Sequence, residues 1–265
     1  MTSFMMPHVY GRLMPEHLNA TGDNCQQQYI INRTLSNYLS ISTKAIEQYA
    51  EIWDTMSKLT NMYENIGDKP RNHYEIQEMK SVFKLDEDDT IFSMTPRQAI
   101  VKTTLEHIYN CKKGDNCVIS IGDIFAQVDV DCLYILSLCF NEVYIYKPNA
   151  TPAILSDKFI ICKDFKMINT EYLKPAICHI LRNEMSCSSL YSRRINNNYM
   201  NTLIEANSVI GQQQLEAINN TITLIEQGKK KEKIEALKKQ QALRCADWNK
   251  RFGVTFHGYK NELEA

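Results

Sequence analysis

The chain has 265 residues, and its 30 Lys and Arg against 31 Asp and Glu give a formal net charge of −1. This length allows one large domain or two small ones with a substantial core. The balanced charge gives no global argument for nucleic-acid binding, so any such role must depend on a local patch. The chain opens with no basic segment followed by an apolar run, and no stretch approaches the ~18 apolar residues of a membrane span, so we expect a soluble, cytoplasmic protein without membrane contact.

The nine cysteines include no C-x-x-C pair. Several of them lie on apolar faces, where cysteine acts as a small hydrophobic side chain. We expect buried thiols in a reducing compartment rather than disulfides or zinc ligands. The sequence therefore predicts no metal site.

Residues 1–28 are rich in Asn, Gln, Pro and His without a clear period, which predicts an irregular N-terminal arm. Residues 29–94 carry helical signals. The main signal is a stripe of apolar side chains, three and four residues apart, from Ile46 to Met62, which predicts one face of a helix that ends near Gly67. Such a stripe is typical of a core or a docking face. We therefore expect a helical N-terminal region.

Two features precede the central part of the chain. The acidic run at residues 86–89 could ligate a hard cation, but without further spaced ligands it favours a solvated acidic loop. A helix is predicted to run to Cys111, with Thr95 as its N-cap and Pro96 at its first position. The lone His107 on this helix could act as a base. A surface position or a satisfied core position is the more usual role of such a histidine.

Residues 117–164 hold the most informative pattern in the chain. Short β-branched runs at residues 118–121, 142–146 and 158–162 predict three strands. Between the first two, apolar residues at helical spacing over residues 128–140 predict a helix. A strand, a crossover helix and a second strand form a right-handed βαβ unit with parallel strands. The pattern therefore predicts a buried sheet and excludes a purely helical bundle.

Short motifs follow one another along this block. Residues 120–125 read Ser-Ile-Gly-Asp-Ile-Phe, and residues 142–148 read Glu-Val-Tyr-Ile-Tyr-Lys-Pro. A loop over residues 151–158 contains Thr-Pro-Ala and Ser-Asp-Lys, and residues 159–163 read Phe-Ile-Ile-Cys-Lys. With the helix before it, the block (about residues 95–164) resembles the distal half of the FtsJ-like ribose 2′-O-methyltransferases, above all the viral-type messenger-RNA cap branch. That family has Lys-x-Phe-Asp, Val-Tyr-Ile-x-Lys-Pro, Ser/Thr-Arg-Pro-x-x-Ser-Glu and Tyr-Val-Val-Cys-Lys at these places.

The resemblance implies an α/β fold: a partial Rossmann-like methyltransferase sheet of two parallel strands plus an antiparallel last strand, flanked by N- and C-terminal helical regions. It implies an α/β core over residues 95–168 and leaves residues 169–265 as a helical C-terminal extension. Rossmann-like enzymes that bind S-adenosylmethionine open with a strand and a Gly-rich turn. No two of the nine glycines lie close enough to form that turn. We therefore expect S-adenosylmethionine as a cofactor only if the protein is active, and none otherwise.

Catalysis in the family depends on a Lys-Asp-Lys-Glu tetrad, in which a lysine lowers the pKa of the target 2′-hydroxyl. The resemblance places the second lysine at Ser120 and the glutamate at Asp157. Serine supplies no cation to the developing alkoxide, whereas Asp157 keeps a carboxylate on a shorter side chain. The sequence offers no counterpart of the other two groups. The resemblance therefore implies a degenerate catalytic site at Ser120 and Asp157.

The C-terminal region offers candidate contacts to RNA. Lysines crowd the helix predicted after Gln227, and such a helix suits phosphate contact by counterion release. The equal alternative is a solvated helix with ion pairs three and four residues apart, such as Glu235 with Lys238. Trp248 and Phe252 could stack bases or pack in a core. The candidate RNA-binding residues are Lys147, Lys158, Lys229, Lys230, Lys231 and Lys233.

Three functions remain open. The preferred one is a degenerate FtsJ-like homologue that serves as an RNA-binding or scaffolding subunit. The second is an active mRNA cap 2′-O-methyltransferase that uses a different lysine, Lys147 or Lys158. The third is a structural helical protein that forms a homo-oligomer or binds a protein partner through its apolar stripe. Abundant Asn, Ile, Lys and Tyr indicate an A/T-rich genome and, with the cap-enzyme resemblance, favour a large DNA virus, in the host cytoplasm or in the virion.

Overall fold

The computed structural model describes residues 2–22, 30–48, 70–94, 100–182, 187–226 and 231–253. Contacts divide the chain into two compact units, and each unit takes in separate stretches of sequence. Unit 1 contains Met1–Ser36, Leu85–Lys147 and Asp157–Ile210. Unit 2 contains Asn37–Lys84, Pro148–Ser156 and Gly211–Ala265.

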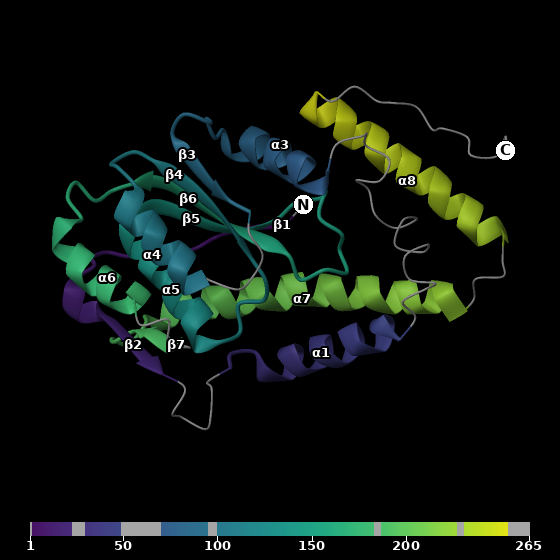
Figure 1. Cartoon of the computed structure of the whole chain (residues 1–265). Coiled ribbons are helices and arrows are strands. Elements are labelled where there is room, and N and C mark those ends of the chain that lie inside the picture. The colour runs from purple at the N-terminus through teal and green to yellow at the C-terminus, as the bar shows by residue number, and fades with distance from the viewer. Residues whose placement is uncertain are drawn as a thin grey trace. The chain divides into compact units, whose positions relative to one another are not determined.

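Unit 1 is built on a five-stranded mixed sheet with the strand order β1-β5-β6-β4-β3 (Figure 1). Strands β3 and β4 are parallel, and the other neighbouring pairs are antiparallel. A separate antiparallel pair, β2 and β7, lies in the same unit. The strands are β1 (Thr2–Met5), β2 (Leu18–Gly22), β3 (Thr90–Ser93), β4 (Asn116–Ile121), β5 (Phe140–Lys147), β6 (Lys158–Phe165) and β7 (Cys187–Tyr191).

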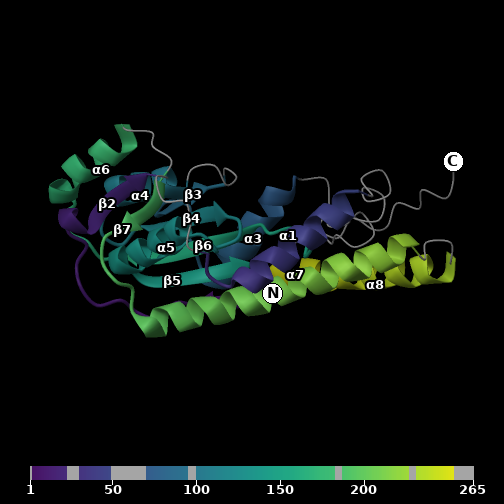
Figure 2. The same cartoon turned by 90° about the horizontal axis from the view of Figure 1, so that it is seen from below.

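Helices connect and flank these strands. Helix α4 links β3 to β4, and α5 links β4 to β5. Figure 2 shows the long helix α7, which belongs to unit 1 up to Ile210 and to unit 2 beyond it. No described helix is both long enough and apolar enough to cross a membrane. The α-helices of the described ranges are α1 (Arg33–Glu47), α3 (Arg71–Phe83), α4 (Ile100–Asn110), α5 (Gln127–Cys139), α6 (Lys174–Arg182), α7 (Asn197–Glu226) and α8 (Lys231–Phe252).

The three predicted strands of the central block are confirmed as β4, β5 and β6. Strand β6 lies between the other two and is antiparallel to both, so β4 and β5 run in the same direction without being neighbours. Strands β4 and β6 are almost entirely buried and consist largely of Val, Ile, Phe and Cys. Such continuous apolar runs are typical of strands that are covered on both faces. The fold is mixed α/β, as the sequence predicts.

The short strands were not predicted. An irregular arm is expected over residues 1–28, but β1 pairs with β5 at the edge of the sheet and β2 pairs with β7. Strand β3 lies within residues 29–94, and β7 within residues 169–265, both expected to be helical. These strands have four or five residues each. So short a segment carries little period of its own, and pairing with a neighbouring strand decides its conformation.

The helix predictions are confirmed in part. Helix α4 covers most of the segment expected to end at Cys111, while Thr95 and Pro96 lie outside the described residues. Helix α1 carries a buried Ile46 near its end, and the rest of the apolar stripe, to Met62, also lies outside them.

Helix α5 is a buried helix, and a carboxylate ties it to β7. Every residue from Val130 to Cys139 is buried. Asp131 Oδ2 accepts hydrogen bonds from the Ser189 hydroxyl at 2.7 Å and from the backbone N–H groups of Leu190 and Tyr191 at 2.8 and 3.1 Å. These bonds satisfy a carboxylate that would be costly to bury alone.

Unit 2 packs α3, α8 and the loop after β5 around a buried acid. Glu78 is fully buried and accepts hydrogen bonds from the N–H groups of Asn149 and Ala150, at 2.9 and 3.2 Å, and from Trp248 Nε1 at 2.8 Å. Trp248 and Phe252 therefore belong to a core, which is one of their two expected roles. The buried cluster consists of Tyr74, Ala150, Cys245, Trp248 and Phe252.

Candidate functional site

Candidate residues from separate parts of the sequence meet at one edge of the sheet in unit 1. Strands β4 and β5 end at this edge, and β6, which runs in the opposite direction, begins there. Ile121 of β4 pairs with Lys158 of β6. Lys147 ends β5, and Asp157 directly precedes β6. The structure thus brings Ser120, Lys147, Asp157 and Lys158 to the same edge.

The strand register divides these residues between the two faces of the sheet. Directly paired residues share a face, and successive residues alternate between faces. Ser120 pairs with Phe159, whereas Ile121 pairs with Lys158, so Ser120 and Lys158 point to opposite faces. By the same alternation, Asp157 shares the face of Ser120.

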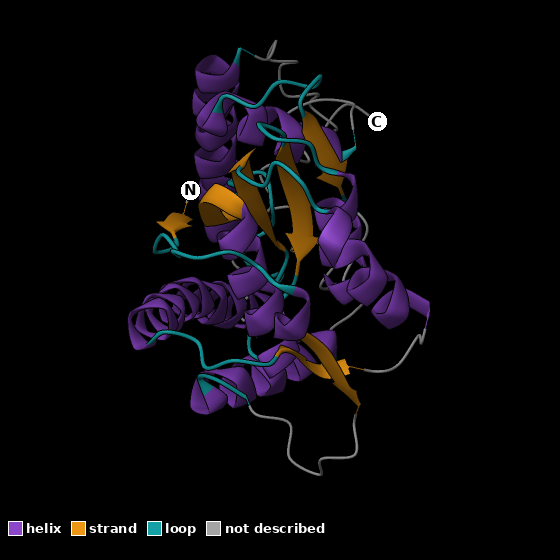
Figure 3. Ribbon diagram, turned by 90° about the vertical axis from the view of Figure 1, so that its left-hand side faces the viewer, coloured by secondary structure: helices purple, strands orange, loops and turns teal. Residues whose placement is uncertain are grey.

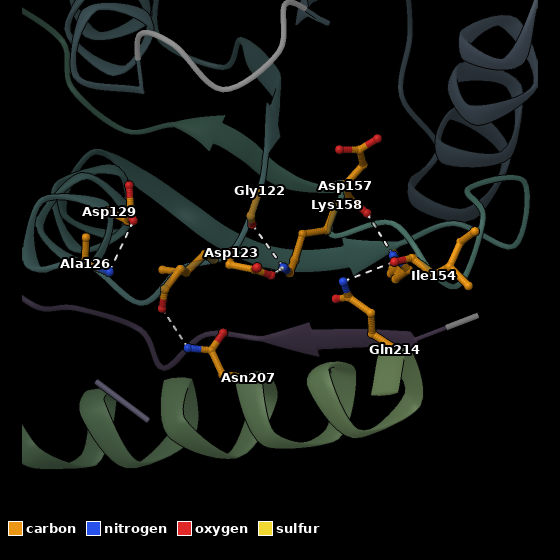
Figure 4. A network of polar contacts seen from close by, with 11 residues as sticks. Gly122, Asp123, Ala126, Asp129, Ile154, Asp157, Lys158, Asn207 and Gln214 are labelled. Atoms are coloured by element: carbon orange, nitrogen blue, oxygen red, sulfur yellow. Dashed lines mark hydrogen bonds and ion pairs between the residues drawn. The ribbon is translucent and has the colours of Figure 1, made fainter. Parts of the chain in front are cut away.

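Lys158 forms a buried ion pair at this edge. Its Nζ donates to Asp123 Oδ1 at 2.8 Å and to the carbonyl oxygen of Gly122 at 3.0 Å (Figure 4). A buried ammonium needs such acceptors, because leaving water without them is costly. The Asp123 side chain is 30% exposed, so solvent still reaches its carboxylate. The charge of Lys158 is therefore balanced inside the protein.

Lys147 is also buried and bonds to the main chain. Its Nζ donates to the carbonyl oxygen of Asp157 at 3.1 Å. Figure 4 shows the Asp157 carboxylate turned away from the ammonium of Lys158, in agreement with the register. The carboxylate that the resemblance aligns with the tetrad glutamate is thus directed away from the ion pair.

The neighbouring strand β3 contributes an uncharged residue to the edge. Strand β3 is parallel to β4 and pairs Ser93 with Ile119, so its carboxyl end lies at the same edge. The residue that follows β3 is Met94. Met94 therefore lies level with Ser120. Of the described residues, Met94 contributes a thioether and Ser120 a hydroxyl to this part of the edge.

Asp129, which the sequence analysis did not single out, adds a second carboxylate near the ion pair. Its Oδ2 accepts the N–H of Ala126 at 3.3 Å at the start of α5. Burial raises the pKa of Asp129 to about 6; the Ala126 N–H opposes this, the Asp123 carboxylate adds to it, and Lys158 opposes it. The Asp123 carboxylate and the Lys158 ammonium thus act on the pKa of Asp129 in opposite directions.

Two further residues of the site were given no role from the sequence. Asp123 stands in the motif at residues 120–125, where the family has the Asp of Lys-x-Phe-Asp, and it follows β4 by two positions. Asn207 is buried on α7, and its Nδ2 donates to the carbonyl oxygen of Ile124 at 2.7 Å. Nothing in the sequence distinguishes Asn207 from the other polar residues of its helix.

His107 lies at a satisfied core position. Its ring is buried, and Nε2 shares a hydrogen bond with the Ser93 hydroxyl at 2.9 Å. Burial lowers the pKa of His107 to about 4, so the imidazole is neutral near pH 7. This geometry favours the core role over that of a base.

The lysine run is only partly described. Residues 229–230 and the side chains of Lys231 and Lys233 lie outside the described residues. Further along α8, Lys238 Nζ lies 3.6 Å from Glu235 Oε1. The two residues are three apart, as expected for ion pairs on a solvated helix. Exposed pairs of this kind contribute little to stability. Phosphate contact by the run stays a prediction.

Within the described ranges, no group of three His, Cys, Asp or Glu side chains could hold a metal ion. Residues 86–89 are exposed, and Asp86 Oδ1 accepts the N–H of Asp88 at 3.3 Å, as in an acidic surface loop. Of the eight cysteines that the structure describes, six are buried thiols, as the sequence predicts. Burial raises the pKa of Cys245 to about 11, so its thiol is protonated at neutral pH.

No protein-family model matches the chain. It is 23% identical over 147 residues to inactive cap-specific mRNA (nucleoside-2′-O-)-methyltransferase 1B of Caenorhabditis briggsae, a match to 48% of this chain and 17% of that protein. It is 31% identical over 85 residues to cap-specific mRNA (nucleoside-2′-O-)-methyltransferase 2 of Danio rerio, covering 31% of this chain and 11% of that protein. An uncharacterised protein of Acanthamoeba polyphaga mimivirus is 25% identical over 136 residues, 50% of this chain and 36% of that protein.

These similarities support a relationship to the FtsJ-like cap methyltransferases, which the order of motifs predicts. The chain spans 17% or less of the length of the cap methyltransferases that it matches. The mixed α/β fold is compatible with the relationship.

Proposed function

We propose that this protein is a divergent homologue of the cap ribose 2′-O-methyltransferases that has lost their chemistry and serves as an RNA-binding or scaffolding subunit. The register between β4 and β6 carries the proposal: Ser120 and Asp157 share one face of the sheet, and Lys158 points to the other. The similarity to a methyltransferase named as inactive, at 23% identity over 147 residues, supports the same function.

Methyl transfer to a ribose hydroxyl needs a group that stabilises the developing alkoxide. Ser120 and the adjacent Met94 carry no charge, and Lys158 would have to leave Asp123 to reach a substrate oxygen. Because the Asp123 carboxylate is partly hydrated, separating this pair costs about 2 to 3 kcal/mol. A cost of this size slows a reaction about 30- to 160-fold. The arrangement therefore disfavours methyl transfer at this edge.

An active cap 2′-O-methyltransferase is the second candidate, and one observation favours it. Lys158, Asp123 and Asp129 bring a cation and two carboxylates to the edge where β4 and β5 end. A carboxyl with a pKa of about 6 is suited to proton transfer near neutral pH. In this case S-adenosylmethionine is the methyl donor, and Lys158 is the residue that stabilises the alkoxide.

Calorimetric titration with S-adenosylmethionine, followed by transfer of a labelled methyl group to capped RNA, separates the two candidates. A known 2′-O-methyltransferase is the positive control. The proposal expects no heat, no thermal shift and no labelled RNA. Micromolar binding, about −8 kcal/mol, with label that is lost in Lys158→Met and kept in Asp157→Asn, would instead establish the active enzyme.

We also propose a viral setting for this function. The similarity to a mimivirus protein, 25% identity over 136 residues, and the many Asn, Ile, Lys and Tyr residues support it. A large DNA virus that caps its messengers in the host cytoplasm would use such a subunit there. Immunodetection in infected cells, with fractionation of cytoplasm, nucleus and virions, tests this setting.

A further inference from the structure

Two pairs of tyrosine and cation lie at the end of the unit 1 sheet opposite the candidate site. The Arg12 guanidinium lies 4.2 Å from the centroid of the Tyr172 ring, and its Nε donates to the Tyr172 hydroxyl at 2.8 Å. Lys174 Nζ lies 4.9 Å from the centroid of the Tyr109 ring. Tyr172 and Lys174 are two residues apart, so the two pairs are neighbours along the chain.

Hydrogen bonds join the segments that form this surface. Lys166 Nζ donates to the carbonyl oxygen of Val9 at 3.3 Å. The N–H of Gly114 donates to the carbonyl oxygen of Phe165 at 2.9 Å, which places the turn after α4 beside the end of β6. Figure 3 views the protein from the side on which α6 lies in Figure 1. The neighbouring segments, named here the tyrosine surface, are residues 8–13, 109–115 and 166–174.

Large side chains are exposed on the tyrosine surface. Tyr10 is 88% exposed, Ile168 is 84% exposed and Tyr109 is 39% exposed. The ring of His8 meets that of Tyr10 in a T-shaped contact, with centroids 4.7 Å apart. Single exposed apolar residues are ordinary, but several on one surface are typical of an interaction site.

The segments of the tyrosine surface contain more cations than carboxylates, whereas the chain as a whole does not. They contain five lysines and arginines against two carboxylates, and the exposed Asp164 lies two residues before the third segment. One of these carboxylates, Glu171, is engaged by Lys174 at 2.5 Å. Lys166 is half-buried, and its Nζ donates to the carbonyl oxygens of Val9 and Ser137. The other cations of the tyrosine surface are Arg12, Lys112, Lys113 and Lys174.

We propose that the tyrosine surface binds single-stranded RNA. Exposed aromatic rings stack bases, and nearby cations contact the phosphates, which together make a platform for single strands. A protein partner fits less well, because lysine is depleted at the centre of a protein interface and most of the cations named here are lysines. Apart from Ile168, the exposed side chains named on this surface are aromatic or charged. The inference rests on the proposed function only in taking RNA as the ligand.

Fluorescence anisotropy with labelled oligouridylate and oligoadenylate of about ten nucleotides tests the proposal. We expect Tyr10→Ala to weaken binding about 5- to 150-fold, the effect of losing one stacked base. Tyr10→Phe keeps the ring and should bind as the wild type does. Tyr38→Ala is the matched control, because Tyr38 is 60% exposed and lies outside the tyrosine surface.

Three results would overturn the proposal. Absence of binding up to about 100 µM protein, the weak limit of non-specific affinity, would exclude RNA as the ligand. Equal affinities for Tyr10→Ala and Tyr38→Ala would place RNA elsewhere on the protein and leave the proposed function intact. Self-association that Tyr10→Ala abolishes, without RNA binding, would make this surface a contact between copies of the chain. The cofactor titration tests the edge near Lys158 separately.

Discussion

Replacing Lys158 with Met removes the buried ammonium and keeps a side chain of similar length. The Asp123 carboxylate then loses its partner at 2.8 Å, and the Gly122 carbonyl loses its donor at 3.0 Å. Water replaces part of the first interaction, because the Asp123 side chain is 30% exposed. Water compensates the Gly122 carbonyl less, and an unpaired buried acceptor is costly.

The size of the effect follows from this difference in exposure. Removing one partner of a fully buried pair costs about 3 to 5 kcal/mol. We expect a smaller loss for Lys158→Met, about 2 to 3 kcal/mol of unfolding free energy, because the remaining carboxylate is partly hydrated. Asp123→Asn keeps an oxygen acceptor but leaves the Lys158 ammonium, 3% exposed, without its counter-charge, so it should cost at least as much, about 2 to 4 kcal/mol. The double variant should lose less than the two single losses together, by about 1 kcal/mol or more.

Urea unfolding followed by far-ultraviolet circular dichroism measures these free energies. Lys113→Met is the matched control, because Lys113 is exposed and substitutions of this kind stay within about 0.5 kcal/mol. A Lys158→Met loss as small as that of the control, or additive single losses, would show that the ion pair contributes nothing. Lys158 would then be available to a substrate, which contradicts the proposed loss of methyl-transfer activity.

Three further predictions concern buried ionisable groups. Glu78→Gln places an amide NH₂ group among the N–H donors that Glu78 accepts and should lower the unfolding free energy by about 2 kcal/mol; an unchanged urea midpoint would contradict the hydrogen bonds to Asn149 and Trp248. For His107, whose pKa is lowered to about 4 from 6.5, stability is complete above pH 6.5 and falls by about 3 kcal/mol as the pH drops to 4; His107→Gln should remove this part of the acid slope, and an unaltered slope would refute it. For Asp129, the pKa is raised to about 6 from 3.8, so its contribution to stability is complete below pH 3.8 and is lost as the pH rises through 6. Asp129→Asn should therefore be more stable relative to the wild type at pH 7.5 than it is at pH 4.

The central part of the fold was predictable because its elements carry their own pattern. The β-branched runs of β4, β5 and β6 and the apolar spacing of α5 mark these elements in the sequence. Strands β1 and β2 carry no such pattern. The four residues Thr2–Met5 become a strand because they pair with Tyr144–Lys147, which no local signal indicates. Pairing of this kind depends on the tertiary fold and lies beyond sequence periodicity.

The sequence indicates which strands carry the candidate residues but not how their side chains are oriented. The structure places Ser120, Lys147, Asp157 and Lys158 at one edge, and their role as a functional site stays a prediction. Which face each side chain occupies depends on the register of β4 against β6, and a shift of one residue would exchange the faces. The register is a property of the folded sheet. The sequence hypothesis that Lys158 substitutes for the family lysine could not be judged without it.

The chain can keep the motif order of the cap methyltransferases and still lose their catalytic activity, because the two properties depend on different residues. Many of the residues that produce the resemblance to the cap methyltransferases lie inside the strands, where Ile145 and Ile160 are buried and a change of size is felt throughout the core. Ser120 and Asp157 lie at strand ends, where a substitution leaves the packing of the sheet intact. Selection for stability therefore preserves the strands without preserving the site. For this reason the resemblance supports the strand arrangement at this edge of the sheet. The activity of the protein depends instead on where Lys158 and Asp157 are placed.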